Sequence, residues 1–336
     1  MEINQKKLWD FVQNNMEQSR ILVVGDVMLD KYYYGDVTRI SPEAPVPITH
    51  VTSTKETLGG AANVAHNLAL LGCQTAIAGF VGDDYHCQSL LDKFTSRGID
   101  YRGIIYTDAP TTTKLRVVGG HQQMLRLDFE ETAPVDEPYA SRYLNYIEQR
   151  LNEGIDALII SDYAKGACTE ETCCRIIDAC HTHNVPVVID PKGSAWEKYM
   201  EADYITPNLR ELNAVLPDPI RNRDEAVEKA ASYIMRKFRI KNVLATRSEC
   251  GVTLVQPEHA EHIPTKAQEV FDVSGAGDTV IAVFTLGIAG GLSPAEAAYL
   301  ANLAASVVVA KLGTYAVSKQ ELLEVLENQQ KKGLEV

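Results

Sequence analysis

The sequence predicts an α/β fold with a mostly parallel sheet covered by helices on both faces. Short apolar runs rich in β-branched residues end in polar or Gly-rich turns and are followed by helical patterns. The five runs are 21–24, 157–160, 185–189, 204–205 and 243–245. Ligands of open α/β sheets bind at the carboxyl ends of the strands. We therefore expect the polar residues that follow these runs to converge on one site.

Composition and charge restrict the class of protein. The 336 residues are 45% hydrophobic and 23% charged, enough to bury a sizeable core as one large or two smaller domains. The net charge of -13 disfavours a nucleic-acid partner or an anionic membrane surface. An anionic substrate would have to be held by local cations.

The N-terminal segment predicts a cytoplasmic protein. Met1 to Arg20 carries acidic and amide residues where a signal peptide would be apolar, and no run reaches the ~20 apolar residues of a membrane span. The odd number of cysteines, seven, fits a reducing compartment.

Two segments break the α/β rhythm, and we expect them to form a small antiparallel β lid. They are 31–52, which holds three consecutive tyrosines and three prolines, and 101–130, which reads as alternating strands. Period two places Lys114 with Arg116 on one face, and Arg126 with Asp128. A face with cations could meet a substrate phosphate; a solvated strand face is the alternative.

A glycine pair precedes a predicted helix that ends at Gly72. Gly59 and Gly60 lie at its open N-terminus, where backbone can approach a ligand, and Asn63 in the first turn offers both a donor and an acceptor. This chemistry suits recognition of a polyol. The glycine fingerprints of dinucleotide-binding and P-loop proteins are absent from the sequence.

The cysteine-rich stretch 168–183 predicts core packing in preference to a zinc site. On a helix from about Glu170, Cys173, Ile177 and Cys180 share one stripe, while Cys174 points elsewhere. No Cys-x-x-Cys pair occurs in the sequence.

The segment Asp272 to Thr279 predicts a phosphate site with a base beside it. An apolar helix follows, so Gly275, Ala276 and Gly277 supply its first free N–H groups, and the helix dipole favours an anion there. Asp278 would repel phosphate, but as a base it could take a proton from an attacking hydroxyl, which indicates phosphoryl transfer to an alcohol. The alternative is an ordinary Gly-rich turn with Asp at a helix start.

These motifs together resemble the ribokinase-like carbohydrate kinase family over nearly the whole chain. The motifs are Gly25-Asp26, Gly59-Gly60-Ala61-Ala62-Asn63, Asn208-x-x-Glu211 and Gly275-Ala276-Gly277-Asp278. Further segments resemble the D-glycero-β-D-manno-heptose-7-phosphate kinases of lipopolysaccharide precursor synthesis: 23–30, 39–47, 114–117, 126–130, 161–166, 189–193 and 311–314. The resemblance implies a single domain over residues 1–336, built as a three-layer sandwich with a mostly parallel sheet.

The resemblance also implies roles for individual residues. Asp278 is similar to the family's catalytic base, and Gly275, Ala276 and Gly277 to its anion hole for the γ-phosphate. The sugar contacts would be Asp26, Gly59, Gly60 and Asn63, and the positions lining the nucleotide would be Lys192, Asn208, Thr246, Gly251 and Asn302. Asn208 and Glu211 would organise Mg²⁺ through water, and Asp272 with neighbouring backbone can hold a monovalent cation.

The expected activity is ATP- and Mg²⁺-dependent phosphorylation of the anomeric hydroxyl of heptose 7-phosphate to the 1,7-bisphosphate. Lys114, Arg116 and Arg126 are candidates for the 7-phosphate, since a dianion needs cations. Two alternatives are a kinase for another sugar phosphate, such as fructose 6-phosphate, and a sugar-phosphate-binding regulator without turnover.

Two further expectations concern domains and assembly. Many relatives carry a C-terminal nucleotidyltransferase with a His-x-Gly-His motif, which this sequence lacks, so we expect phosphorylation without nucleotidyl transfer. A lid with apolar faces suits pairing with a second lid, which predicts a homodimer.

Overall fold

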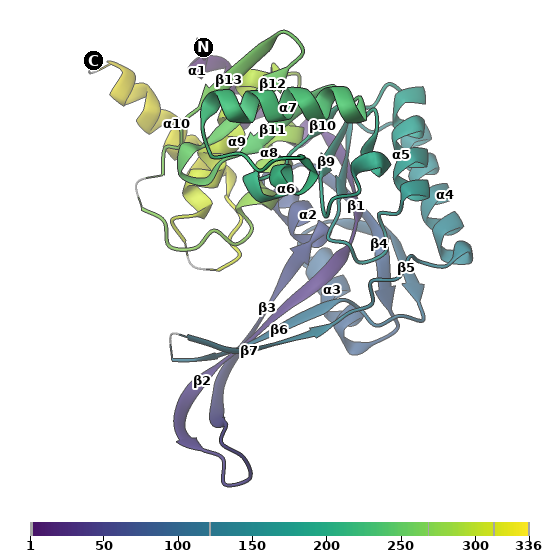
Figure 1. Ribbon diagram of the computed structural model, residues 1–336, viewed down its shortest axis with the longest axis vertical. Coiled ribbons are helices and arrows are strands. Elements are labelled where there is room, and N and C mark those ends of the chain that lie inside the picture. Colours follow the sequence, from purple (N-terminus) through teal and green to yellow (C-terminus); the bar gives the residue numbers. More distant parts are fainter. Residues whose placement is uncertain (1–2, 121, 268, 312, 335–336) are drawn as a thin grey trace.

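A large, mostly parallel sheet forms the centre of the molecule (Figure 1). The computed structural model describes residues 3–120, 122–267, 269–311 and 313–334. Within these ranges the sheet has nine strands, in the order β13 (His259–Ile263), β12 (Val252–Gln256), β11 (Asn242–Thr246), β10 (Tyr204–Ile205), β9 (Val187–Asp190), β8 (Ala157–Ser161), β1 (Arg20–Gly25), β4 (Gln74–Gly82) and β5 (Asp100–Thr107). Neighbours from β5 to β11 are parallel, and β12 and β13 add an antiparallel edge. The five predicted strands are consecutive neighbours, β1 and β8 to β11, which confirms the prediction.

Helices cover both faces of this sheet and complete three layers (Figure 1). One face packs against α1 (Gln5–Asp10), α2 (Ala61–Leu70), α3 (Tyr85–Ser96), α8 (Ala276–Ala289), α9 (Pro294–Val308) and α10 (Lys319–Leu334). The other packs against α4 (Glu137–Glu153), α5 (Glu170–Thr182), α6 (Leu209–Val215) and α7 (Asp224–Phe238). Short turns of other helix types span Phe11–Asn15, Met16–Gln18, Trp196–Tyr199 and Ser248–Cys250. Among the described residues, none of the helices combines the length and apolar character needed to cross a bilayer.

Alternating side chains of the central strand feed two separate cores. In β1, Ile21 and Val23 pack with α2 and α8, whereas Leu22 and Val24 pack with α4 and α5. All four side chains are almost completely buried, and each such burial contributes roughly 1.5–3 kcal/mol. This two-sided burial explains why the strand reads as a continuous apolar run.

The helix boundaries agree with the sequence predictions. The helix α8 begins directly after Gly275, and α2 begins directly after Gly60. In α5, Cys173 and Cys180 are buried and Cys174 is only partly so, as the predicted stripe requires.

A second, small sheet projects from the carboxyl end of the main sheet (Figure 1). We call it the lid sheet; its strands lie in the order β3 (Pro47–Gly60), β2 (Val27–Ile40), β6 (Thr113–Gly119) and β7 (Gln122–Phe129). The pairs β2–β3 and β6–β7 are antiparallel, and β2–β6 is parallel. The long β2–β3 hairpin extends beyond β6 and β7.

The expected boundaries of the lid need correction. Residues 100–107 form β5, which pairs with β4 in the main sheet, because Ile104 and Ile105 are buried there. The lid sheet also takes in Val27 to Asp30 and Ser53 to Gly60, since β2 begins two residues after β1 ends and β3 runs directly into α2. The parallel β2–β6 pair makes the lid sheet mixed, where the sequence had suggested an antiparallel one.

The two faces of the lid sheet differ in chemistry. Cross-strand register places Tyr32, Arg116 and Arg126 side by side, and likewise Asp30, Lys114 and Asp128. The period-two assignment of these side chains to one face is therefore confirmed. The opposite face of β7 carries Leu125, Leu127 and Phe129, which are 42–52% exposed.

Candidate active site

A cavity of about 170 Å³ opens where the carboxyl ends of β8 to β11 meet the start of α8. Polar groups from separate strand ends line it, as expected for the carboxyl edge of a parallel sheet. It is lined by these predicted residues: Lys192, Asn208, Glu211, Thr246, Gly275, Gly277 and Asp278. A larger open groove of about 910 Å³ beside α7 is lined by none of them.

Asp278 lies in the first turn of α8 with its carboxylate held on both oxygens. Asn63 donates to Oδ2 and the hydroxyl of Tyr163 donates to Oδ1, each at 2.6 Å. The side chain is 6% exposed, and this burial raises the pKa of Asp278 to about 6, although both hydrogen bonds act to lower it. Asp30 adds to the rise and Lys192 opposes it. A carboxyl group with this pKa is suited to general-base catalysis near neutral pH.

The turn before α8 presents backbone amides to the cavity. Gly275 caps the helix with φ +79°, a left-handed conformation that favours glycine. Within the described ranges, the amides of Gly275 and Gly277 make no hydrogen bond, whereas that of Ala276 donates to the carbonyl of Val273 at 3.2 Å. The two glycine amides are therefore available to an anion, together with the helix dipole.

The N-terminus of α2 lies against the same base. A Cβ on Gly59 would lie 2.6 Å from Oδ2 of Asp30, and Gly60 has φ +55°, so both positions need glycine for the close approach of β3 to β2. Asn63 is buried and uses its amide on Asp278. One turn further, the hydroxyl of Thr279 donates to Asn67 at 2.8 Å, so a buried polar ladder joins α2 and α8.

Asp26 is not directed at this cavity. Its Oδ2 accepts from the backbone amides of Tyr163 at 2.7 Å and Lys165 at 3.0 Å, and its Oδ1 accepts from Ala167 at 3.1 Å. The carboxylate therefore anchors the loop that follows β8. Burial raises the pKa of Asp26, with a further rise from Asp162.

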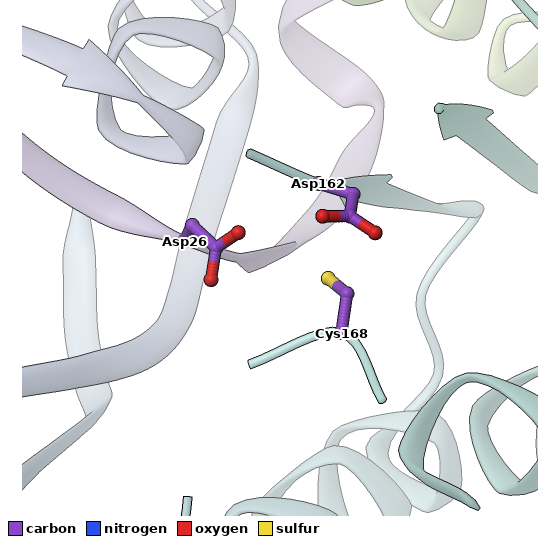
Figure 2. A group of neighbouring side chains, drawn as sticks. All are labelled: Asp26, Asp162 and Cys168. Carbon is purple, nitrogen blue, oxygen red and sulfur yellow. The ribbon is translucent and has the colours of Figure 1, made fainter. Parts of the chain in front are cut away.

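Figure 2 shows the neighbouring side chains of Asp26, Asp162 and Cys168, whose ligand atoms all lie within 4.8 Å of one another. Three such side chains could resemble a metal site, but their polar atoms are already engaged. Asp162 accepts from Tyr199 at 2.6 Å and from the Ala164 amide at 2.7 Å, and it pairs with the ammonium of Lys198. The Lys198 ammonium supplies the positive charge that the carboxylates require, so the group serves as a structural network.

Two residues that the sequence reasoning missed face the catalytic region. Asp30 lies on the charged face of the lid sheet beside Gly59, and its charge acts on Asp278. Period two along β2, with Gly59 paired opposite Met28, could have identified it. Tyr163 also lines the cavity, but it lies in a loop without any periodic pattern that would have singled it out.

The Asn208-x-x-Glu211 motif caps α6 at the cavity wall. The Glu211 amide donates to Oδ1 of Asn208, and the Asn208 amide donates to Oε2 of Glu211, both at 3.0 Å. The other oxygen of Glu211 lies 3.4 Å from the ammonium of Lys192. Asn208 forms a parallel bridge with Thr246, which brings the ends of two strand regions together.

Gly251 and Asn302 lie apart from the residues that line this cavity. Asn302 is buried and donates to the carbonyls of Ile263 and Pro264 at 3.4 and 2.9 Å. Gly251 has φ +80°, and a Cβ there would lie 2.1 Å from the carbonyl oxygen of Ile263. Both residues support the packing of β13 against its neighbours.

The three lid cations are paired with carboxylates. Lys114 lies 2.9 Å from Glu130 and 3.4 Å from Asp128, Arg116 lies 2.5 Å from Asp30, and Arg126 lies 2.9 Å from Asp128. Glu130 also pairs with Lys165 of the loop after β8, at 2.8 Å. Ion pairs therefore link the lid sheet to the loop that carries Tyr163.

The buried Asp278 carboxylate lies beside free amides at the start of α8, and the sequence was compared with models of known protein families. A family model described as pfkB family carbohydrate kinase matches residues 18–321. The chain belongs to the pfkB family of carbohydrate kinases. Members of this family are phosphotransferases that act on a sugar hydroxyl, so the suggested kinase resemblance is confirmed.

Relatives of this pfkB-family chain include larger proteins. It is similar to the Bifunctional protein HldE of Stutzerimonas stutzeri, with 45% identity over 315 residues, which are 94% of this chain and 65% of that protein. The corresponding protein of Shewanella piezotolerans is 44% identical, over 93% of this chain and 64% of that protein. The chain thus spans just under two thirds of the length of these curated relatives.

Solved structures share the fold of this pfkB-family chain. Ribokinase from Thermotoga maritima has a TM-score of 0.70 and 23% identity, covering 92% of this chain and all of that one. Phosphofructokinase-2 from Escherichia coli in complex with potassium has a TM-score of 0.75 and 20% identity, covering 93% and 99%. Arabidopsis thaliana ribokinase, complexed with ribose and ATP, has a TM-score of 0.72 and 19% identity, covering 92% and 99%. These likenesses confirm the predicted ribokinase-like fold.

Proposed function

We propose that this chain transfers the γ-phosphoryl group of ATP to the anomeric hydroxyl of D-glycero-β-D-manno-heptose 7-phosphate, giving the 1,7-bisphosphate. The reaction would take place in the cytoplasm, in the synthesis of lipopolysaccharide precursors. The observation that carries the proposal is the buried Asp278, which lies beside free amides and near the charged face of the lid sheet. The resemblance of segments 114–117, 126–130 and 161–166 to heptose-7-phosphate kinases supports the choice of sugar, since all three meet in the Lys114–Glu130–Lys165 network.

Asp278 acts as the general base in this proposal. With a pKa of about 6 it is ionised at neutral pH and takes the proton of the sugar hydroxyl as that oxygen attacks the γ-phosphorus. The amides of Gly275 and Gly277 stabilise the charge on the transferred group, with the dipole of α8 behind them. Ala276 contributes through its small side chain, because its amide already has a partner.

Lys192 is placed to contact the phosphates of ATP. Its ammonium lies over the ring of Tyr163 at 5.9 Å from the centroid and within 3.4 Å of Glu211, at the cavity wall. Thr246 lies on the same wall. Gly251 and Asn302 act on the nucleotide end indirectly, by fixing the backbone around Ile263 and Pro264.

The donor set at the cavity fits Mg²⁺. Asp190, Asn208 and Glu211 line the cavity with side-chain oxygens. Burial, followed by the charges of Asp278 and Glu211, raises the pKa of Asp190 well above its usual value. Such a cluster of oxygen donors suits a hard cation that keeps several waters. Asn208 and Glu211 would hold the ion through water, and Mg²⁺ when bound would neutralise charge on the phosphates.

Asp272 is proposed to support a monovalent cation. Its carboxylate accepts from the amides of Ser274 at 2.9 Å and Gly313 at 3.0 Å, so it joins the two loops beside α8. Burial alone would raise the pKa of Asp272. These hydrogen bonds and the charge of Arg116 outweigh burial, so the pKa lies below its usual value. A cation here would stiffen the turn that presents Gly275.

The charged face of the lid sheet is proposed to hold the 7-phosphate. Lys114 and Arg116 are mostly buried side chains with fixed partners, and Arg126 at the outer edge is half exposed. Gly59 packs against Asp30 of this face, and Asn63 contacts Asp278, so we propose that Asp30, Gly59, Gly60 and Asn63 contact the sugar ring. Asp26 would contribute by holding the loop above the ring.

The chain is proposed to form a homodimer through the lid sheet. Leu125, Leu127 and Phe129 project from one face of β7, and Val117 lies beside Leu125 on β6. A sheet face this apolar favours burial against a second copy. The molecular mass in solution, measured by light scattering for the wild type and for Leu125→Lys, tests this: the variant should be monomeric.

The test of function is ADP release by the purified protein with MgATP and a panel of sugars. Heptose 7-phosphate, fructose 6-phosphate and unphosphorylated heptose are compared, with Asp278→Asn alongside each. Preference for heptose 7-phosphate that is lost in the variant supports the proposal. Preference for fructose 6-phosphate would replace the substrate and keep the mechanism, and sugar-phosphate binding without turnover would indicate a regulator.

A further inference from the structure

The proposed mechanism uses Asp278 as the general base but gives no role to Tyr163, whose side chain contacts it. Tyr163 lies in the loop between β8 and α5, and its hydroxyl donates to Oδ1 of Asp278 at 2.6 Å. On the other oxygen, Asn63 donates to Oδ2 at the same distance. One donor therefore holds each oxygen, and the donors come from opposite sides of the main sheet edge.

The loop that carries Tyr163 is fixed by a buried carboxylate. Asp26 is 3% exposed and accepts three backbone N–H groups of this loop, from Tyr163, Lys165 and Ala167. Hydrogen bonds to an ionised group are stronger than neutral ones, so the three together set the loop firmly.

The backbone next to Tyr163 is also strained. Ala164 has φ +57°, a left-handed conformation that a residue with a Cβ rarely adopts, and its amide is held by Oδ1 of Asp162 at 2.7 Å. Strain of this kind persists only where surrounding contacts impose it. The contacts here hold the backbone on both sides of Tyr163, and from this backbone its hydroxyl reaches Asp278.

We infer that Tyr163 is a positioning residue that, together with Asn63, fixes the rotation of the Asp278 carboxylate for proton transfer from the sugar hydroxyl. This inference rests on the proposed kinase function. A carboxylate held on one oxygen only can rotate about its Cβ–Cγ bond, which moves its free lone pairs away from an incoming hydroxyl. Two short hydrogen bonds to different oxygens prevent that rotation. Tyr163 and Asp278 line the same cavity, so the fixed carboxylate faces the space where the sugar would lie.

The charges around Tyr163 and Asp278 keep the Tyr163 hydroxyl protonated. Asp278 is faced by Asp30 from β2, Asp190 from β9 and Lys192 from the turn after β9. Burial, followed by Asp278 and Asp190, raises the pKa of Tyr163 well above its usual range, so the hydroxyl stays protonated and remains a donor. Its hydrogen bond favours the ionised carboxylate and lowers the pKa of Asp278.

The test is the variant Tyr163→Phe, which removes one hydroxyl and keeps the ring. Two measurements are made: the pH profile of kcat and of kcat/KM, and a ¹³C NMR titration of the Asp278 side-chain carboxyl. We expect kcat near pH 6.5 to fall about 3–30-fold, and both the acidic limb and the titration midpoint to move up by about 0.5–1 pH unit. The KM for ATP should stay within about twofold of wild type, because the tyrosine acts through Asp278.

The matched control is Tyr139→Phe. Tyr139 also donates to a carboxylate, Asp108, at 3.0 Å, but on α4 and away from the residues that line the cavity. This control should keep the wild-type rate and the wild-type Asp278 midpoint. Thermal unfolding of each variant shows whether it is folded.

The outcomes separate the inference from the proposed function. A folded Tyr163→Phe protein with the wild-type acidic limb and the wild-type Asp278 midpoint overturns the inference. If no sugar is phosphorylated by the wild type, the proposed function fails, but the NMR midpoint still reports whether the tyrosine hydroxyl acts on Asp278. A midpoint raised in Tyr163→Phe and unchanged in Tyr139→Phe shows that the hydroxyl acts on Asp278 in either case, and the positioning role is supported when kcat also falls in Tyr163→Phe alone.

Discussion

The side-chain amide of Asn63 lies 2.6 Å from Oδ2 of Asp278, although 215 positions separate the two residues in the chain. The first belongs to the helix that follows the Gly59-Gly60 pair, and the second to the helix that begins directly after Gly275 and has Ala276 and Gly277 as its first residues. The contact therefore joins the two glycine motifs into one site. A second contact reinforces it: Thr279, next to Asp278, donates to Asn67, which lies one turn after Asn63. The packing of α2 on α8 therefore sets the position of Asp278.

Replacing the base should abolish most turnover. We expect Asp278→Asn to lower kcat by about 10²–10⁴-fold, the usual contribution of a general base, with little change in nucleotide affinity. Steady-state kinetics and nucleotide titration check both parts. A variant with near-normal kcat would remove Asp278 from the mechanism.

The pH dependence of turnover follows from the raised pKa of Asp278. The base must be ionised to accept a proton, so kcat/KM should rise with pH through a midpoint of about 6 and level off above pH 7. The profile is measured with the coupling enzymes in excess at each pH. A limb centred near pH 4, the ordinary range for aspartate, would contradict the burial of this group.

The same burial should make the base costly for stability at high pH. Because the pKa of Asp278 is raised on folding, its contribution is most favourable below pH 4 and is lost as pH rises through 6. Asp278→Asn should therefore be more stable than wild type at pH 8, by about 1–3 kcal/mol, and the gain should disappear near pH 4. Urea unfolding at both pH values measures it; a gain of equal size at pH 4 would point to another cause.

Two glycines with the same backbone conformation allow a controlled test of the anion turn. Gly275 and Gly291 have φ of +79° and +80°, but a Cβ on Gly275 would lie 3.0 Å from Thr314 and 3.1 Å from Asn63, whereas one on Gly291 meets nothing within 4 Å. Both alanine variants should lose about 1 kcal/mol of stability from the left-handed strain. Only Gly275→Ala should also lose turnover, by about 10-fold or more. Equal kcat values in the two variants would contradict a role for this turn.

The lid cations should act on the sugar phosphate and not on ATP. We expect Arg116→Ala and Lys114→Ala to raise the KM for heptose 7-phosphate about 10–100-fold, since a charge-assisted contact to phosphate is lost, with the KM for ATP nearly unchanged. Arg102→Ala is the control, because Arg102 forms a similar pair with Asp100 but is 70% exposed on β5. A comparable rise for all three variants would indicate a general effect of charge.

The features that sequence could predict are those set by local pattern. Three features follow from apolar runs and their polar or glycine ends: the five central strands, the start of α2 after Gly60 and of α8 after Gly275, and the gathering of polar residues at one sheet edge. Those polar residues are Lys192, Asn208, Glu211 and Thr246. Parallel strands place their carboxyl ends together, so the order of neighbours did not need to be known.

The remaining features depend on contacts between distant segments. Asp26 sits between β1 and β2, after Gly25 with φ +138°, and belongs to neither alternation, so its turn away from the cavity could not be read from the pattern. Tyr163 meets Asp278 across 115 positions from a loop that three amide contacts hold in place. The assignment of β5 to the main sheet likewise depends on β4, which local alternation does not reveal.

The ion pairs on the lid sheet have a consequence for selectivity. Lys114, Arg116, Arg126 and Lys165 face three carboxylates, Asp30, Asp128 and Glu130, so that this group of described residues is nearly neutral before any sugar arrives. On the proposed function, a sugar without a phosphate carries no anion that could replace those carboxylates, so it would leave these ion pairs intact. A phosphate dianion can compete with the carboxylates for the same cations. On the proposed function, the ion pairs would therefore disfavour neutral sugars and still allow a sugar phosphate to bind.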